Sequence, residues 1–167
     1  MDADAKKTAL RAIPYGLYVL AAEAPDGRVT AATVNWVTQA SFEPPLVAVG
    51  VKADSSGHQI IKDTGAFALS VLGKGQQSQA FAFFKPVERD GDEIGGETFR
   101  KGVTGSPILS SAIAAVECSL VTTVEEGDHS IFVGRVVDAS VQSEISGRPD
   151  DATLILKDLG EKTFYGG

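Results

Sequence analysis

Short hydrophobic runs rich in Val, Ile, Leu and Phe recur along the chain, and turn-forming residues separate them. Residues 16–24 and 28–37 form two such runs, and the Pro-Asp-Gly sequence at 25–27 predicts a tight turn between them. Together the three segments predict a β-hairpin. A further run, 44–52, opens with two prolines, which strands tolerate at their first residues, and it predicts another strand.

The second half of the chain continues this strand pattern. Residues 66–73 predict one strand, and residues 129–141 predict a long one in which Gly134 indicates a bulge or a close approach by another element. Residues 106–124 predict a helical turn that continues as a strand. Residues 152–167 predict a short strand followed by a tail.

Helix signals are few and short. The first dozen residues predict a helix that ends before Pro14. Residues 53–65 predict a second helix, because Ser55 or Ser56 can cap its start and Gly65 can end it.

One more helix and one long loop complete the pattern. Residues 75–86 have helical spacing that ends at Pro86, and the charged, glycine-rich residues 87–105 predict a long surface loop. Strands do not alternate with helices, so the pattern favours an antiparallel barrel or a sandwich with helical insertions.

Size and charge narrow the class of protein. A chain of 167 residues predicts one domain, 1–167, that can bury a core without disulfides. The net charge of −7 and the scattered Lys and Arg residues argue against nucleic-acid binding. No run approaches the ~18 apolar residues of a membrane span, and the first residues lack a signal-peptide core. We therefore expect a cytoplasmic protein that binds no membrane.

Cysteine and histidine give no metal signal. Cys118, the one cysteine, lies in an apolar strand-like run and predicts a buried small hydrophobic residue. His58, His129 and Cys118 do not have the spacing of zinc ligands, so no metal site is predicted.

Three segments could carry chemistry. In the first, a strand ends at Lys52 and a helix begins after Ser55 and Ser56, near His58. Free N–H groups at a helix start, hydroxyl groups and an ammonium group together favour a phosphate. The same residues also fit a capped surface helix with a solvated lysine.

The second segment surrounds the single tryptophan, Trp36, where the strand 28–37 ends. Polar residues crowd this region, and buried ones would need partners such as the carbonyl and NH groups of a planar ring. A strand with one solvated face fits equally well. The polar residues are Thr33, Asn35, Thr38, Gln39 and Ser41.

The third segment is His129, which follows Gly127 and Asp128 at the start of a strand. Its imidazole can donate or accept a hydrogen bond at neutral pH, and Asp128 could orient it. No nucleophilic serine turn accompanies it, so a catalytic triad is not predicted. An ordinary turn residue is the alternative. A Rossmann dinucleotide fingerprint is also absent.

In their order along the chain, these segments resemble the flavin reductase-like family of FMN-binding split barrels. The resemblance runs from about Ile13 to Val141. The stretches that carry it are IPYGLYVLAA, TAATVNWVTQASFEPPLVAVGV, DSSGHQII, GAFALSVLGKGQQSQAFAFF, SPILSSAIAAVECSL and GDHSIFVGRV.

The resemblance implies a mainly β protein: a split β-barrel of antiparallel, Greek-key type with short flanking helices, working as a homodimer. It implies that the flavin ring lies along Thr33, Val34, Asn35, Trp36, Thr38, Gln39 and Ala40. It places the flavin phosphate at Lys52, Ser55, Ser56 and His58. His129, with Asp128, would read a nicotinamide, and Tyr165 of the tail would approach the flavin.

The implied activity is an NAD(P)H:FMN oxidoreductase that passes electrons to an oxygenase or another protein acceptor. FMN is favoured over FAD or riboflavin, and NADH or NADPH would be the reductant. No catalytic side chain is expected, because the flavin itself supplies the hydride chemistry. The alternative is a non-catalytic FMN-binding electron-transfer protein that serves a rubredoxin or diiron system.

Overall fold

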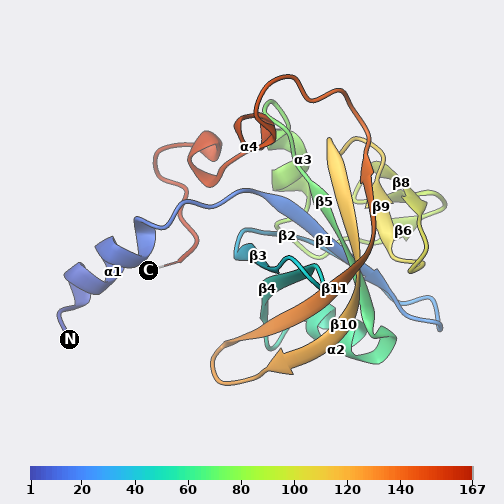
Figure 1. Ribbon diagram of the computed structural model, residues 1–167, viewed down its shortest axis with the longest axis horizontal. Coiled ribbons are helices and arrows are strands. Elements are labelled where there is room, and N and C mark those ends of the chain that lie inside the picture. Colours follow the sequence, from blue (N-terminus) through green and yellow to red (C-terminus); the bar gives the residue numbers. More distant parts are fainter. Residues whose placement is uncertain (167) are drawn as a thin grey trace.

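The structure, a computed structural model, describes residues 1–166 and is mainly β, as predicted (Figure 1). Its helices are α1 (Ala3–Arg11), α2 (Ser56–Thr64), α3 (Gln77–Ala82), α4 (Pro149–Ala152) and the 3-10 helix η1 (Leu156–Leu159). Its strands are β1 (Tyr18–Glu23), β2 (Val29–Val34), β3 (Val37–Ser41), β4 (Leu46–Lys52), β5 (Ala66–Val71), β6 (Arg89–Asp90), β7 (Glu93–Ile94), β8 (Glu97–Lys101), β9 (Pro107–Leu109), β10 (Ala114–Val124) and β11 (His129–Val141).

Seven strands form one antiparallel sheet in the order β2-β1-β5-β10-β11-β4-β3. β2 and β3 are its two edges, yet only Asn35 and Trp36 separate them in the chain. In a flat sheet, six strand spacings would hold the edges ~29 Å apart, whereas three residue steps reach at most ~11 Å. The sheet therefore curls until its edges approach each other at Asn35–Trp36. In the described chain no strand pairing joins those edges, so hydrogen bonds do not close the predicted barrel.

The predicted hairpin is confirmed, but its second strand is shorter than expected. β1 and β2 pair in antiparallel register, and Gly27 has a positive φ of 88° in the turn between them. The sequence predicted a continuous strand over 28–37, whereas β2 ends at Val34. The chain bends at Asn35–Trp36 because residues from Val37 onward pair with β4 instead of β1.

The segment 87–105, predicted as a surface loop, instead contributes three strands to a second sheet with the order β6-β7-β8-β9. Ile94 of this segment is fully buried and joins the main core cluster. The helical turn predicted at the start of 106–124 is also wrong, because Pro107–Leu109 forms β9. One buried Ile in a charged sequence was too weak a signal to predict this packing.

The predicted helices are confirmed. The Ser55 hydroxyl caps α2 by accepting a hydrogen bond from the N–H of His58 at 3.2 Å, and Gly65 ends the helix with a φ of 67°. The apolar face of α2, with Ile60 and Ile61, packs into the core. By contrast, α1 buries no residue and stands apart from the sheets (Figure 1).

The sequence predicted a bulge or a close approach at Gly134 of β11, and the structure shows both. A Cβ at this position would lie 2.6 Å from the Phe67 ring and 2.7 Å from Cys118 Cβ, so the close approach requires glycine. The register between β10 and β11 also shifts at this point, between Leu120 and Thr122. Cys118 is fully buried, as predicted, and burial raises its thiol pKa to about 12.

The end of the chain forms no regular strand, which corrects the prediction for 152–167. Thr153 and Ile155 make single bridges to Gly73 and Gly16, and η1 follows. Leu154 between them is fully buried, so this segment is anchored although it lacks a ladder. None of the described helices is both long enough and apolar enough to traverse a lipid bilayer.

Candidate functional site

The main candidate site is a cleft with a volume of about 650 Å³. Its walls come from β2, the end of β4, the start of α2, the segment after α3 and the C-terminal residues. The Trp36-bearing segment and the helix start, far apart in the chain, thus face one cavity. Both sequence segments that favoured a ligand contribute to it.

Eight of the predicted site residues line this cleft: Thr33, Val34, Asn35, Lys52, Ser55, Ser56, His129 and Tyr165. Six lie outside its lining: Trp36, Thr38, Gln39, Ala40, His58 and Asp128. The exposed residues Thr38, Gln39 and Ala40 belong to β3, beyond the bend that separates it from β2. Trp36 supports the cleft from behind, since its ring packs over Gly50 of β4.

The start of α2 presents free hydrogen-bond donors. The Ser55 hydroxyl donates to the Lys52 carbonyl at 2.7 Å and accepts from the His58 N–H. Its hydrogen and one of its lone pairs are therefore already used in capping the helix. The N–H groups of Ser56 and Gly57 have no hydrogen-bond partner in the part of the chain that is described, as expected at a helix start. These N–H groups and the Ser56 hydroxyl, rather than Ser55, are the free donors.

Gly57 allows this helix start to lie against β2. A Cβ at position 57 would come within 3.0 Å of Thr30 Oγ1. A larger residue would therefore require the Thr30 side chain or the helix start to shift by a few tenths of an ångström.

Lys52 brings a positive charge close to the start of α2, but it forms an ion pair with Asp54. Its Nζ lies 3.0 Å from Asp54 Oδ1, and both side chains are largely exposed. The hydrogen bond that Lys52 donates to Asp54 raises the pKa of the Lys52 ammonium, so Lys52 is charged at neutral pH. Lys85, after α3, is a second cation in the cleft lining.

The segment after α3 is the part of the site that the sequence did not predict. Thr33 ties it to β2, because its N–H donates to the Phe83 carbonyl at 3.0 Å and its hydroxyl donates to the Ala80 carbonyl at 2.7 Å. Phe83, Phe84, Lys85 and Pro86 therefore reach the cleft. The sequence signal that could have indicated this part of the site is the pair Phe83–Phe84 followed by Lys85, at the end of a helix.

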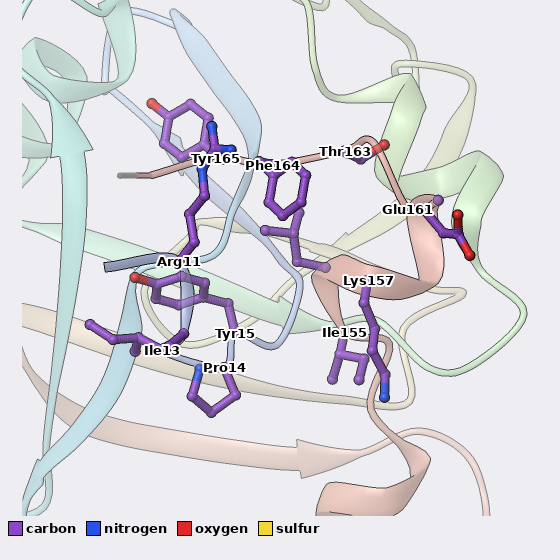
Figure 2. Close-up of a pocket in the computed structure, with 13 residues that line it drawn as sticks. Arg11, Ile13, Pro14, Tyr15, Ile155, Lys157, Glu161, Thr163, Phe164 and Tyr165 are labelled. Carbon is purple, nitrogen blue, oxygen red and sulfur yellow. The ribbon is translucent and has the colours of Figure 1, made fainter. Parts of the chain in front are cut away.

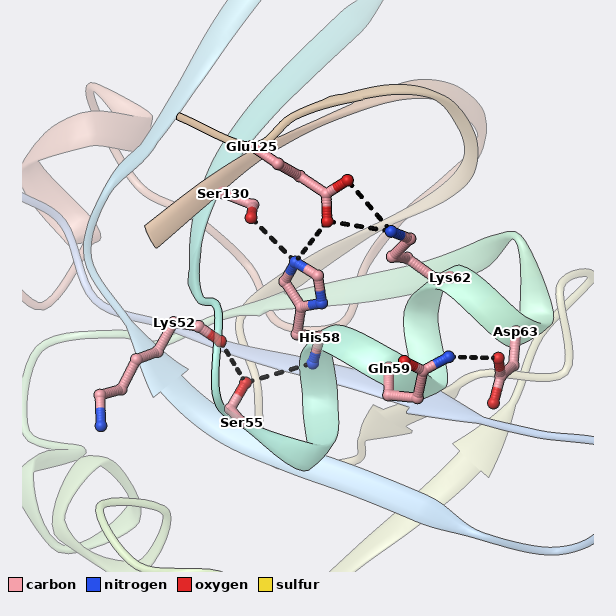
Figure 3. A network of polar contacts seen from close by, with 8 residues as sticks. All are labelled: Lys52, Ser55, His58, Gln59, Lys62, Asp63, Glu125 and Ser130. Atoms are coloured by element: carbon pink, nitrogen blue, oxygen red, sulfur yellow. Dashed lines mark hydrogen bonds and ion pairs between the residues drawn. The ribbon is translucent and has the colours of Figure 1, made fainter. Parts of the chain in front are cut away.

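His58 is directed into the protein and not into the cleft (Figure 3). Its Nε2 lies 2.8 Å from Ser130 Oγ and 3.4 Å from Glu125 Oε1, and its ring meets Phe132 edge-on. Lys62 holds Glu125 in place with a contact of 2.9 Å. Figure 3 also shows the Lys52 ammonium pointing away from His58, so these two residues do not converge on one ligand.

His129 lies in the cleft lining directly beside Lys52, its partner in the pairing of β11 with β4. Its Nδ1 is 3.0 Å from Asp128 Oδ1, as predicted, and its Nε2 is 2.7 Å from the Tyr165 hydroxyl. A carboxylate only accepts, so Nδ1 carries the proton, and the Nε2 of a neutral ring accepts from the phenol. The hydrogen bond from His129 lowers the pKa of Asp128, and burial raises that of the Tyr165 phenol.

Comparison with known proteins identifies the family. A profile described as the flavin reductase like domain matches residues 10–158. The chain therefore belongs to the flavin reductase-like family, as its sequence motifs predicted.

Individual relatives agree with this assignment. A "flavin reductase" of Pseudomonas putida is 33% identical over 80% of this chain and 76% of that protein. A "probable flavin reductase" of Rhizobium meliloti is 34% identical over 81% of this chain, but the match covers only 42% of its own length. A "high molecular weight rubredoxin" of Moorella thermoacetica is 33% identical over 80% of this chain and 58% of that protein. The chain thus spans well under two thirds of some relatives.

Solved structures share the fold. The NADH:FAD oxidoreductase of Streptomyces globisporus, in complex with NAD and FAD fragments, superposes with a TM-score of 0.73 at 28% identity, covering 92% of this chain and 87% of that one. An FMN-binding protein of Thermus thermophilus gives a TM-score of 0.68 at 29% identity, covering 78% of this chain and 71% of that one.

The residues of the cleft fit a flavin nucleotide. A volume of about 650 Å³ falls within the usual range of cofactor sites, roughly 300–1,000 Å³. Apolar side chains of Leu17, Leu20 and Phe83 can cover a flat ring, and the free donors at the start of α2 suit its phosphate.

Proposed function

We propose that the protein is an NAD(P)H-dependent flavin reductase that uses FMN. The observation that carries this proposal is the shared cleft: a ring-sized apolar part, an anion-binding helix start and His129 all line one cavity. Relatives with reductase names support the activity. The choice of FMN rests on the anion site, which suits a terminal phosphate.

At the phosphate end, the N–H groups of Ser56 and Gly57 would hold the phosphate of FMN, with Lys52 adding positive charge. Lys85 lines the same cleft and offers a second ammonium group. Such N–H donors need no reorganisation, because α2 is anchored in the core by Ile60 and Ile61.

When bound, the flavin supplies the hydride-transfer chemistry, which no side chain provides. The chain's own task is alignment. Thr33 and Val34 line the β2 wall and would contact the ring. Asn35, whose amide donates to the Tyr165 carbonyl, and His129, through Nε2, would face the nicotinamide. Asp128 keeps the other ring nitrogen protonated and so determines which nitrogen faces the substrate.

Trp36, Thr38, Gln39, Ala40 and His58 were also predicted to bind the flavin. They do not line the cleft, so they have no direct role in this proposal. Trp36 and His58 would act by supporting the walls.

We further propose a homodimer that delivers electrons to an oxygenase or another protein acceptor. The β10–β11 hairpin supports the dimer, because it exposes apolar side chains that a second copy could cover. These are Val121, Val124, Ile131, Val137 and Val141. Analytical ultracentrifugation tests the proposed dimer. Ile131→Lys should turn a dimer into a monomer. Val103→Lys is the control, because Val103 is exposed outside this hairpin, and it should leave the dimer intact.

The rival function is an FMN-binding electron carrier without nicotinamide activity, working in the cytoplasm with a rubredoxin or diiron partner. The rubredoxin name of one relative favours it.

Anaerobic mixing of the FMN-loaded protein with NADH or NADPH separates the two functions. Rapid loss of the visible flavin absorbance is the expected result. A flavin that stays oxidised with both nucleotides would rule out the reductase and favour the carrier.

A further inference from the structure

The last residues that the structure describes, 160–166, run along the cleft, and Thr163, Phe164 and Tyr165 line it; we call this segment the C-terminal strap. Its base is fixed: Leu154 is fully buried, and its N–H donates to the Leu72 carbonyl at 2.8 Å. Beyond η1, the backbone turns at Gly160, whose φ is 122°. The strap therefore has an anchored base and a glycine at which its direction can change.

Tyr165 of the strap bonds two polar residues of the cleft lining. Its hydroxyl donates to His129 Nε2 at 2.7 Å, and its carbonyl accepts from Asn35 Nδ2 at 3.2 Å. Its ring centroid lies 5.3 Å from that of Trp36. The nitrogen of His129 that would face a nicotinamide is therefore already bonded within the chain.

The docked strap is only partly buried. Phe164 and Tyr165 remain about half exposed, at 53% and 48%. The indole Nε1 of Trp36 is buried without a hydrogen-bond partner among residues 1–166, and Gly166 lies over it. A buried donor without a partner disfavours the state that buries it, so release of the strap would return this N–H to water.

A second cavity lies beside the strap (Figure 2). It has a volume of about 310 Å³ and separates the strap from the chain around Pro14. Arg11 spans this space: its Nε donates to the Gly166 carbonyl at 3.2 Å, and its guanidinium lies 4.4 Å from the centre of the Phe164 ring. The strap thus rests on a few specific contacts next to open space.

We propose that the C-terminal strap is an intramolecular competitor of the nicotinamide: it occupies His129 and Asn35 in the free protein and is displaced when the nucleotide binds. This inference rests on the proposed reductase function. The apparent affinity for the nucleotide is then reduced by the fraction of molecules whose strap is open. With two neutral hydrogen bonds at stake, we expect a reduction of about three- to tenfold.

Four forms of the protein test this proposal: the full chain, a chain that ends at Gly160, Tyr165→Phe and the control Tyr15→Phe. Tyr15 lines the second cavity without touching His129, so its variant removes a comparable hydroxyl outside the proposed contact. Initial rates at saturating FMN give KM for NADH, and quenching of Trp36, the single tryptophan, gives the Kd for FMN. Release of C-terminal residues by carboxypeptidase, with and without NADH, reports strap opening independently of turnover.

The expected result is a KM about three- to tenfold lower for the shortened chain, a smaller decrease for Tyr165→Phe and none for Tyr15→Phe, with the Kd for FMN unchanged. NADH should also accelerate carboxypeptidase release from the full chain. Equal KM values in all four forms, or weaker FMN binding by the shortened chain, would overturn the strap proposal alone. Absence of NADH oxidation and of NADH-dependent release in every form would overturn the reductase function and the strap together.

Discussion

The two histidines of this chain lie in opposite settings, although both were predicted to bind a ligand. His58 is 7% exposed, bonded to Ser130 and packed against Phe132 inside the core. His129 lies at the rim of the cleft, where a carboxylate and a phenol from the C-terminal strap hold its two nitrogens. His58 is thus held by the core, whereas His129 is held by side chains at the protein surface.

This difference matches the different requirements of a phosphate site and of a substrate site. In the proposed function, the phosphate needs fixed donors, which the start of α2 would supply. A substrate that must enter and leave needs groups that can change partners, and His129 with the strap would supply those. The expected effects of substitution differ in the same way at the two sites.

The largest effect is expected at Phe132, which is fully buried. Phe132→Ala should lower the free energy of unfolding by about 3–5 kcal/mol, because it removes a large core side chain and leaves a cavity. Tyr165→Ala, an aromatic truncation in the strap, should cost less than about 1 kcal/mol. Urea unfolding of both variants checks this, and equal losses would mean that the strap belongs to the core.

The histidines themselves give the second comparison. His58→Ala should cost about 1–3 kcal/mol of stability, because it leaves the buried Ser130 hydroxyl without its bond. FMN affinity should change little. His129→Ala should leave stability within about 0.5 kcal/mol and raise KM for NADH about tenfold, the loss of one good hydrogen bond.

Unfolding curves, FMN titrations and initial rates of both variants measure this difference. Loss of FMN binding in His129→Ala would place His129 at the flavin instead of the nicotinamide. Ser130→Ala is the matched control for His58, and the two substitutions together should cost less than the sum of the single losses.

The Lys52–Asp54 ion pair predicts smaller effects on FMN affinity, opposite in direction for its two residues. Lys52→Ala should weaken FMN binding by about 1 kcal/mol, since exposed charges are screened, and the loss should shrink at high salt. Asp54→Asn should strengthen binding, because it frees Lys52 from its 3.0 Å partner. FMN titration at two ionic strengths tests both. Lys62→Ala, whose ammonium bonds Glu125, is the control and should have no effect.

The smallest expected effect is the pH dependence of the strap. Burial raises the pKa of the Tyr165 phenol in the docked state. Docking is therefore fully present below the ordinary tyrosine pKa of about 10 and weakens as pH rises through the raised value. Trp36 fluorescence should change in that alkaline range in the full chain and stay flat in Tyr165→Phe. The same change in both proteins would assign it to another group.

Local signals predicted much of this molecule. The cap at Ser55, the glycine that ends α2 and the turn before β2 depend on neighbouring residues, so they could be recognised in the chain. The burial of His58 also had a signal: it lies three residues before Ile61, on the same face of the helix.

Other features had no local signal. The bend at Asn35–Trp36 arises because β3 pairs with β4, a partner that no nearby residue specifies. Residues 87–105 looked like a loop because their strands are only two to five residues long, and Ile94 finds its core partners elsewhere in the chain.

By itself, the sequence determined the mainly β class, the helix start that favours an anion and the family, because these depend on local chemistry and on the order of motifs. Only the tertiary structure decided which of the predicted ligand-binding residues share a cavity and that residues 83–86 also line it. It also decided that the Tyr165 hydroxyl bonds the second ring nitrogen of His129. The physical reason is that side-chain partners are set by strand register and by the curl of the sheet. Both follow from pairing between residues that are distant along the chain.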